Sequence, residues 1–125
     1  MSISFDAGSF DAGRLTELGE DLGDPEFLRQ TVRVYLDELP GRTAMMHHAV
    51  RTDDRRLLED SAHSLGSASA MLGALELADA CRSVEQLAGT ADMDSLMVLV
   101  DLWTSAVERA EAALRQWLSA QGSNL

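Results

Sequence analysis

Residues 53–88 read DDRRLLEDSAHSLGSASAMLGALELADACRSVEQLA, and this stretch decides the fold class. Apolar and small residues recur every three or four positions, first along 53–72 and again along 75–88. That spacing gathers them on one side of a helix, whereas a half-buried strand would alternate every second residue. Gly73 separates the two runs, and glycine is common just past a helix end. The sequence therefore predicts two amphipathic helices joined by a tight turn, with Asp53 capping the first.

The chain on either side continues this periodicity. Residues 24–51 carry one apolar stripe, which begins with Asp24 as a capping residue and Pro25 in the first turn. The stripe passes through Pro40 in phase, which favours one kinked helix over two. Residues 92–120 carry the longest stripe, and a short additional helix is expected near the N-terminus. Such helices bury their stripes best as an antiparallel four-helix bundle, so the predicted fold class is all-α.

The composition fits one folded domain. The chain has 125 residues, of which 46% are hydrophobic and 25% are charged, with few glycines and prolines. This profile excludes disordered, collagen-like and low-complexity chains. We expect a single free-standing domain over 1–125, with flexible ends at 1–8 and 121–125. No apolar run approaches the roughly 20 residues that cross a bilayer, and no signal-peptide pattern is visible, which predicts a cytoplasmic protein without a membrane partner.

The charge and cysteine content exclude several function classes. The net charge is −11, and all ten basic residues are arginine, so a nucleic acid would be repelled and the partner is expected to be a protein. The single cysteine, Cys81, cannot form an internal disulfide, and no set of cysteines and histidines has the spacing of a zinc site. No glycine-rich phosphate loop is present. We therefore expect no cofactor, no metal site and no ATP site in this chain.

A candidate functional residue stands out where the apolar pattern breaks. Helical geometry turns His63 about 140° away from its stripe, so its side chain should face water. The same outer side carries Glu59, Gly66, Ser67 and Ala70. Glycine costs about 1 kcal/mol relative to alanine in a helix, so small residues on an exposed face suggest that a partner approaches closely. The alternative is an ordinary surface histidine beside neutral substitutions.

The predicted hairpin brings a carboxylate to the same height. His63 and Glu85 are equally far from a turn at Ala74, so they should lie level on adjacent helices. A carboxylate that accepts a hydrogen bond from Nδ1–H would leave the lone pair of Nε2 facing outward, where it could act as a nucleophile. The alternative is that Glu85 is only a solvated charge. By the same symmetry Arg82 falls level with Gly66 and turns outward.

Residues 61–87, SAHSLGSASAMLGALELADACRSVEQL, resemble the signature of histidine-containing phosphotransfer (HPt) domains of bacterial phosphorelays. Upstream, residues 23–54 are similar to the long helix of that family, including its mid-helix proline. The resemblance implies that His63 is the phosphoryl-accepting residue and that Glu85 hydrogen-bonds its ring. The residues in register with the family signature are Ala62, His63, Leu65, Leu72, Gly73, Ala74, Cys81 and Glu85.

The chain departs from the family beside the histidine. HPt domains usually have lysine three residues after it and glycine four residues after it, whereas this chain has Gly66 and Ser67. The lysine is thought to steady the phosphoryl group. We hypothesise that the guanidinium of Arg82 replaces the missing ammonium. The alternative is a solvated arginine.

The resemblance implies a phosphocarrier in a two-component phosphorelay. His63 would accept a phosphoryl group from the phosphoaspartate of a response-regulator receiver domain, on a regulator or a hybrid sensor kinase, and pass it to another receiver. The receiver would supply Mg²⁺ and would dock over Glu59, Gly66, Ser67 and Ala70. We expect a monomer without autokinase activity.

Two other functions are compatible with the sequence. Loss of the lysine motivates an HPt-like interaction module that binds a receiver or kinase without carrying phosphate. An enzyme using Glu59, Asp60 and His63 as acid and base groups is disfavoured, because an exposed convex helix face lacks the pocket that catalysis usually needs.

Overall fold

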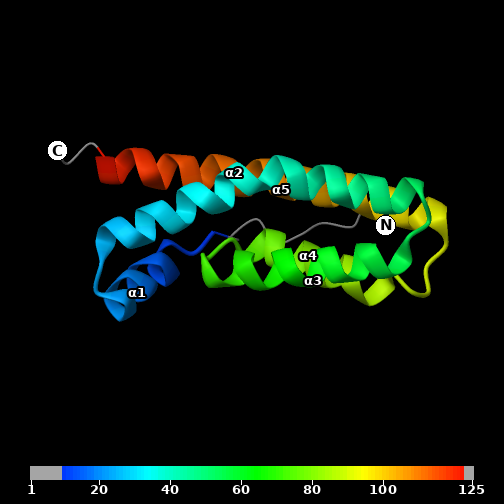
Figure 1. The fold of residues 1–125 in the computed structure, drawn as a ribbon, viewed down its shortest axis with the longest axis horizontal. Coiled ribbons are helices and arrows are strands. Elements are labelled where there is room, and N and C mark those ends of the chain that lie inside the picture. The colour runs from blue at the N-terminus through cyan, green and yellow to red at the C-terminus, as the bar shows by residue number, and fades with distance from the viewer. Residues whose placement is uncertain (1–9, 123–125) are drawn as a thin grey trace.

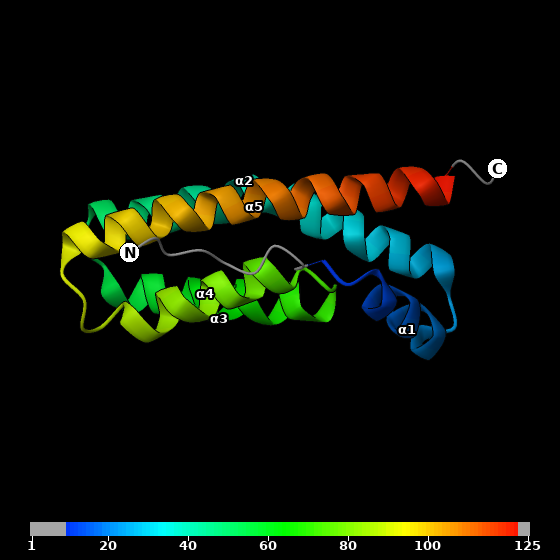
Figure 2. The ribbon, with the colours of Figure 1, turned by 180° about the vertical axis from the view of Figure 1, so that it is seen from behind.

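The computed structural model describes residues 10–122, and every regular element in that range is a helix. The predicted all-α bundle with a short additional N-terminal helix is confirmed. Figure 1 shows α2 and α5 side by side as the long pair, with α3 and α4 as a shorter pair beneath them. The view from behind in Figure 2 shows that α1 fills the end where α2 and α5 extend past the hairpin of α3 and α4. The elements are α1 (Ala12–Leu22), α2 (Pro25–Arg51), α3 (Arg55–Met71), α4 (Leu75–Leu87) and α5 (Met93–Gly122).

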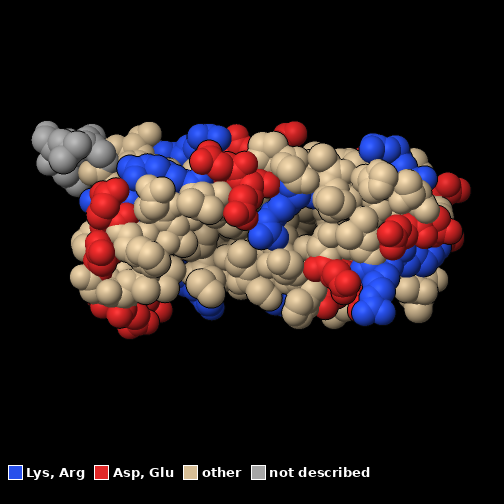
Figure 3. Space-filling model, in the orientation of Figure 1, with Lys and Arg blue, Asp and Glu red and all other residues tan. Residues whose placement is uncertain are grey.

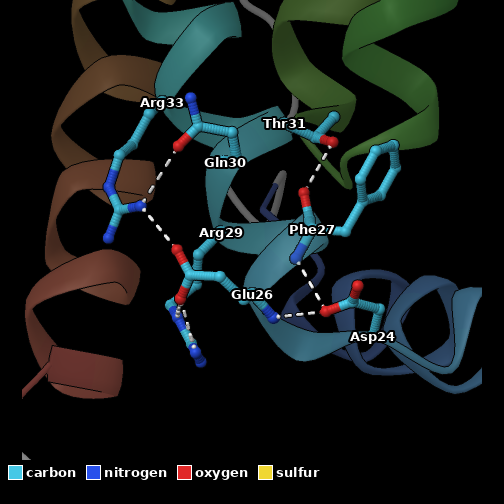
Figure 4. A network of polar contacts seen from close by, with 7 residues as sticks. All are labelled: Asp24, Glu26, Phe27, Arg29, Gln30, Thr31 and Arg33. Atoms are coloured by element: carbon cyan, nitrogen blue, oxygen red, sulfur yellow. Dashed lines mark hydrogen bonds and ion pairs between the residues drawn. The ribbon is translucent and has the colours of Figure 1, made fainter.

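The start of α2 is fixed by the predicted capping residue. The Oδ1 atom of Asp24 accepts hydrogen bonds from the backbone N–H groups of Glu26 and Phe27, each at 3.1 Å (Figure 4). Glu26 pairs in turn with Arg29 at 2.8 Å and with Arg33 at 3.2 Å, and these hydrogen bonds lower the pKa of the Glu26 carboxyl. The carboxylate of Asp24 satisfies two free amides, and both carboxylates interact favourably with the positive end of the helix dipole, so the helix begins sharply at Pro25.

α2 is one continuous helix through Pro40, as the in-phase stripe predicts. Figures 1 and 2 show that it changes direction part-way along its length. A helix-interior proline removes one backbone hydrogen bond, and the buried stripe on either side compensates for that loss. The continuous helix carries a row of exposed residues past the middle of α3.

The predicted start of α3 is wrong by one residue. Asp54, and not Asp53, caps the helix, because its Oδ1 accepts a hydrogen bond from the N–H of Leu57 at 3.1 Å. Asp53 has a φ of 52°, in the left-handed region that aspartate tolerates better than most residues. The connection between α2 and α3 uses this conformation to reverse the chain, so the helix starts at Arg55.

Of the two ends that were expected to be flexible, the structure describes only residues 121 and 122. Residues 121 and 122 are the last two residues of α5, and the expectation of a flexible end there stays a prediction. The expected flexibility of 1–8 and of 123–125 lies outside the described residues.

α3 and α4 form the predicted hairpin. Gly73 has a φ of 82°, and a side chain there would collide with the carbonyl of Asp11. The backbone N–H of Asp11 donates to the carbonyl of Gly73 at 2.8 Å, which ties the segment before α1 to the turn. Because the turn is this tight, α3 and α4 pack closely along their lengths and set opposing residues level with each other.

Among the described residues, the side chains of Trp103, Tyr35 and Ser69 form hydrogen bonds inside the core. Trp103 is fully buried, and its Nε1–H donates to Sγ of Cys81 at 3.2 Å. The hydroxyls of Tyr35 and Ser69 lie 2.6 Å apart. Burial raises the pKa of the Cys81 thiol to about 11 and the pKa of Tyr35 to about 12. Cys81 is therefore a protonated core residue, which agrees with its position in the predicted stripe.

Within the described part of the chain, none of the helices is both long enough and apolar enough to cross a bilayer.

Candidate functional site

The site centres on His63, which projects into solvent from the middle of α3. Its side chain is 68% exposed, although Ala62 and Leu65 beside it are buried. The side chain of Glu85 on α4 is 32% exposed, and its Oε2 atom lies 2.7 Å from Nδ1 of His63. The predicted level placement of these two residues is therefore present in the structure.

This contact determines what the imidazole can do. An ionised carboxylate has no hydrogen to donate, so Nδ1 must carry the hydrogen of the bond with Glu85. In the neutral imidazole the lone pair is then on Nε2, the nitrogen that does not contact Glu85. The ring is held in place by one nitrogen and can use the other as a nucleophile.

A shallow hollow of about 220 Å³ lies beside the ring, between α3 and α4. We call it the His63 hollow. Small side chains keep it open, and Arg82 supplies a cation at its edge. It is lined by His63, Gly66, Ser67, Ala70, Ala78, Arg82 and Glu85.

Packing between α3 and α4 explains why residue 66 is glycine, and the sequence alone did not predict this. Gly66 is half-buried, and a Cβ atom added to it would lie 3.0 Å from Cβ of Cys81. That distance is tighter than most contacts of real Cβ atoms, so glycine at this position lets α3 and α4 approach each other. The expectation that Gly66 faces a partner on an open surface is therefore wrong in part, because α4 covers one side of it. Periodicity measured from one stripe could not reveal this second contact.

The other expected docking residues occupy different environments. Ser67 is exposed, whereas Ala70 is half-buried and its carbonyl accepts a hydrogen bond from Arg14 at 3.4 Å. Glu59 is exposed about one turn before His63 and does not line the His63 hollow. The structure thus places Ser67 and Ala70 in the hollow with His63 and leaves Glu59 outside it.

Arg82 lies where the hairpin symmetry predicts. Its side chain is 62% exposed, and its Nη1 atom lies 3.0 Å from Oδ1 of Asp79, one turn earlier on α4. An exposed pair of this kind contributes little to stability, so the guanidinium can leave Asp79 when a stronger anion is present. The lining of the His63 hollow therefore includes a cation whose ion pair is weak.

The family model described as Hpt domain matches residues 30–117, a range that contains both His63 and Glu85. The chain belongs to the Hpt domain family. Hpt domains are phosphocarriers rather than catalysts, and they work with receiver domains in phosphorelays.

Two solved Hpt structures share the fold. One is histidine-containing phosphotransfer protein B (HptB) from Pseudomonas aeruginosa PAO1, with a TM-score of 0.82, 20% sequence identity, and coverage of 92% of this chain and 98% of that chain. The other is the HPT domain from an Hpt sensor hybrid histidine kinase from Shewanella, with a TM-score of 0.71, 19% identity, and coverage of 92% and 97%. A comparison with curated proteins gave no match.

This Hpt domain has a second depression on the other side of α3, which the sequence analysis did not anticipate. It has a volume of about 530 Å³ and lies between α2 and α3. We call it the α2–α3 groove. Figure 3 shows the face where α2 and α3 meet, hollowed near its middle and edged with charged side chains. The groove is lined by Asp37, Glu38, Gly41, Arg42, Met45, Met46, Asp60, Ser61, Ser64 and Leu65.

The remaining histidines lie apart from this site on α2. Nε2 of His47 lies 3.0 Å from the hydroxyl oxygen of Thr104 on α5, and His48 is exposed. Within residues 10–122, no group of three or more histidine, cysteine, aspartate or glutamate side chains is arranged to hold a metal ion.

Proposed function

We propose that this Hpt domain carries phosphate on His63, accepting it from the phosphoaspartate of one receiver domain and donating it to another. The observation that supports this most strongly is the 2.7 Å contact between Nδ1 of His63 and Glu85 on an otherwise exposed ring. It leaves Nε2 as a nucleophile on the surface, where the aspartate of a docked receiver could reach it.

The transfer balances as a displacement at phosphorus. The Nε2 lone pair forms a bond to phosphorus while the acyl phosphate bond breaks, and the receiver's aspartate leaves as a carboxylate. The product is a phosphorylated imidazole that still carries its hydrogen on Nδ1 and gains positive charge. Glu85 stabilises that charge through its hydrogen bond. The reverse reaction delivers the phosphoryl group to the second receiver.

Arg82 supplies the positive charge that the family signature takes from lysine. In this role its guanidinium leaves Asp79 and binds the phosphoryl oxygens once phosphohistidine has formed. Glu59, Gly66, Ser67 and Ala70 would border the docked receiver. The support for this assignment is that Arg82, Gly66, Ser67 and Ala70 line one hollow with His63.

The partner performs the remaining chemistry. Mg²⁺ would be bound by the receiver, where it neutralises the charge of the acyl phosphate. With no phosphate-binding loop in its sequence, this chain would not phosphorylate itself from ATP. We further propose that it acts as a monomer in the cytoplasm, where receiver domains could reach His63.

One observation favours a second candidate function. Gly66 and Ser67 replace the lysine and glycine of the signature, so this domain could bind a receiver without carrying phosphate. The exposed ring and its bond to Glu85 favour the phosphocarrier, because a binding surface alone needs neither.

Phosphotransfer separates the two functions. Receiver domains phosphorylated with a labelled small-molecule donor are mixed with the protein, and the label on each chain is followed over time. The phosphocarrier predicts acid-labile, base-stable label on the wild-type protein and on His48→Gln, and none on His63→Gln. A receiver that binds the protein tightly but never transfers label to it contradicts phosphate carriage and supports the binding module.

A further inference from the structure

Glu85 lies in the last turn of α4, two residues before the helix ends at Leu87. Helix ends open more readily than helix centres, because their last carbonyl groups have no partner within the helix. A carboxylate in the last turn also lies near the negative end of the helix dipole. The last turn of α4 contains no basic residue of its own. The residue that orients His63 therefore occupies a segment that α4 alone stabilises poorly.

The first residue of α3 supplies the missing cation. Nη1 of Arg55 donates hydrogen bonds to the carbonyl oxygens of Ala88, at 3.1 Å, and Ala91, at 2.6 Å. Its Nε donates to Oδ1 of Asp53 at 3.1 Å, which orients the guanidinium. The Arg55 side chain is 33% exposed, so water only partly screens these contacts. A cation bonded to carbonyls at the end of α4 satisfies them and interacts favourably with the helix dipole.

The same guanidinium fixes the connection from α4 to α5. Oδ1 of Asp92 accepts a hydrogen bond from the backbone N–H of Ser95 at 2.8 Å, where α5 starts. Hydrogen bonds from Ser95 lower the pKa of the Asp92 carboxyl, and the positive charge of Arg55 adds to this effect. Arg55 therefore holds together the end of α4, the connection after it and the start of α3.

The contact between His63 and Glu85 lies between the two ends of the hairpin. The turn at Gly73 closes one end, and Arg55 joins α3 to α4 at the other. Arg55 precedes His63 by eight residues, or about 12 Å along α3, so it acts on the site through the position of α4. Ala88 follows Glu85 by only three residues. Because hydrogen bonds weaken steeply with distance and misalignment, a small movement of this end of α4 would break the bond to His63.

We propose that Arg55 is a positioning residue, which keeps the last turn of α4 in place and thereby holds the carboxylate of Glu85 against Nδ1 of His63. The inference rests on the proposed function for the use made of His63, but the effect on the ring precedes any phosphoryl transfer. Without the guanidinium the end of α4 opens, and the neutral imidazole becomes a mixture of two tautomers. The tautomer with hydrogen on Nε2 has no lone pair there to attack phosphorus.

The tautomer of His63 tests the proposal directly. Arg55→Met keeps an aliphatic side chain and removes every donor, whereas Arg55→Lys restores a charged group that can donate to both carbonyls. Nitrogen NMR at about pH 8.5, where histidine side chains are ordinarily neutral, shows which ring nitrogen carries the hydrogen. The spectrum of His63→Gln assigns the signals. We expect Arg55→Met to shift the tautomer ratio toward hydrogen on Nε2 by roughly two- to five-fold, the size of a helix-end charge effect, and Arg55→Lys to restore most of it.

Arg109→Met is the matched control. It breaks the 2.7 Å contact of Arg109 with Glu76, which lies in the first turn of α4, far from Glu85. The side chain of Glu76 is 7% exposed, so the variant loses stability by leaving a buried acceptor unpaired. We expect a lower urea midpoint and an unchanged His63 tautomer. If Arg55→Met is unfolded in buffer, spectra of all variants in trimethylamine N-oxide give the same comparison, because this osmolyte stabilises folded chains without supplying donors.

Phosphotransfer gives a second and independent measurement. A residue that acts through Glu85 has no further effect once Glu85 is removed. We expect Arg55→Met alone to slow transfer from a phosphorylated receiver by roughly two- to five-fold, in step with the tautomer ratio. On the Glu85→Ala background it should cause no further loss. An equal loss in the presence and absence of Glu85 would overturn the proposed route through α4.

The possible outcomes separate positioning from phosphate carriage. If label reaches His63 but Arg55→Met has the wild-type tautomer, the positioning role is overturned and the phosphocarrier stands. If the tautomer shifts but no receiver ever labels His63, the positioning role stands and the phosphocarrier fails. If Arg55→Met and Arg109→Met shift the tautomer equally, the cause is a general loosening of the fold and the proposal is overturned.

Discussion

Nδ1 of His63 on α3 lies 2.7 Å from Oε2 of Glu85 on α4, so one helix orients the exposed ring of its neighbour. The tight turn at Gly73 makes this possible, because it sets residues equally far from the turn at the same height. The glutamate is a positioning residue in the proposed mechanism, since it acts on phosphorus only through the imidazole.

Replacing Glu85 should separate its hydrogen bond from its charge. Glu85→Gln keeps an oxygen acceptor for Nδ1–H, so we expect phosphotransfer to slow only a few-fold. Glu85→Ala removes the acceptor, and a hydrogen bond to a charged group is worth about 1.5–3 kcal/mol, so we expect a loss of about ten-fold or more. Transfer rates from a phosphorylated receiver measure both, with Glu108→Ala on α5 as the control. Equal rates for Glu85→Ala and wild type would rule out the positioning role.

Arg82 and Asp79 should act in opposite directions on phosphohistidine. Arg82→Ala removes the proposed contact with the phosphoryl group and should shorten the phosphohistidine lifetime several-fold. Asp79→Asn frees the guanidinium from its 3.0 Å pairing and should lengthen that lifetime, by about two-fold because exposed pairs are weak. The decay of labelled protein after removal of the receiver measures both effects. The control is Arg115→Ala, which breaks a comparable exposed pair with Glu111 on α5. Lifetimes that do not respond to Arg82→Ala would show that the arginine is only a solvated charge.

Two glycine-to-alanine substitutions should have opposite effects on stability. At Gly66 the added methyl group would lie 3.0 Å from Cβ of Cys81, so we expect a loss of about 1–3 kcal/mol as α3 and α4 are forced apart. At Gly41 the methyl group meets nothing, so we expect a gain of up to about 1 kcal/mol from helix propensity. Urea unfolding followed by circular dichroism measures both. If Gly66→Ala were as stable as the wild type, close packing of the hairpin would not explain this glycine, and contact with a partner would be the remaining explanation.

The buried thiol and phenol predict a loss of stability at high pH. Burial raises the pKa of Cys81 from its ordinary 9.0 to about 11 and that of Tyr35 from 10.0 to about 12. Between the ordinary and raised values, the unfolded chain releases protons that the folded chain keeps, so the free energy of unfolding falls as pH rises from about 9. For the thiol alone the loss is at most roughly 3 kcal/mol. Well below pH 9 these two groups contribute no pH dependence.

Urea titrations at about pH 8 and about pH 10.5 measure this effect. Cys81→Ala keeps the Cβ atom that lies beside Gly66 but removes the Sγ atom to which Trp103 donates, so the variant should be less stable than the wild type at about pH 8. Because it has no thiol to ionise, its free energy of unfolding should fall less on going to about pH 10.5. An identical decline in the variant and the wild type would show that Cys81 does not contribute to the alkaline transition.

The helices were predictable because each buries one stripe of residues at helical spacing. Asp24, Pro25 and Gly73 marked helix ends correctly, since capping and left-handed conformations are local properties of the chain. The cap of α3 was misplaced by one residue, because two adjacent aspartates could each serve and only the path of the connection assigns Asp53 to the turn.

The site was predictable where hairpin symmetry determined it and not elsewhere. Equal distance from the turn places His63 beside Glu85, but it does not say how closely the two helices of the hairpin approach each other. Gly66 was therefore expected to be open to a partner, although α4 covers one side of it. The α2–α3 groove depends on how α2 packs on α3, which neither stripe specifies. The available signal was Gly41, an unexplained glycine in the interior of a helix.

The most direct test of the account is to identify the phosphorylated nitrogen by phosphorus and nitrogen NMR, after transfer from a phosphorylated receiver to isotope-labelled protein. The account predicts one phosphohistidine, at Nε2 of His63, whose Nδ1 keeps its hydrogen in the bond with Glu85. Phosphate on Nδ1, phosphate on His47 or His48, or no phosphohistidine at all would contradict it.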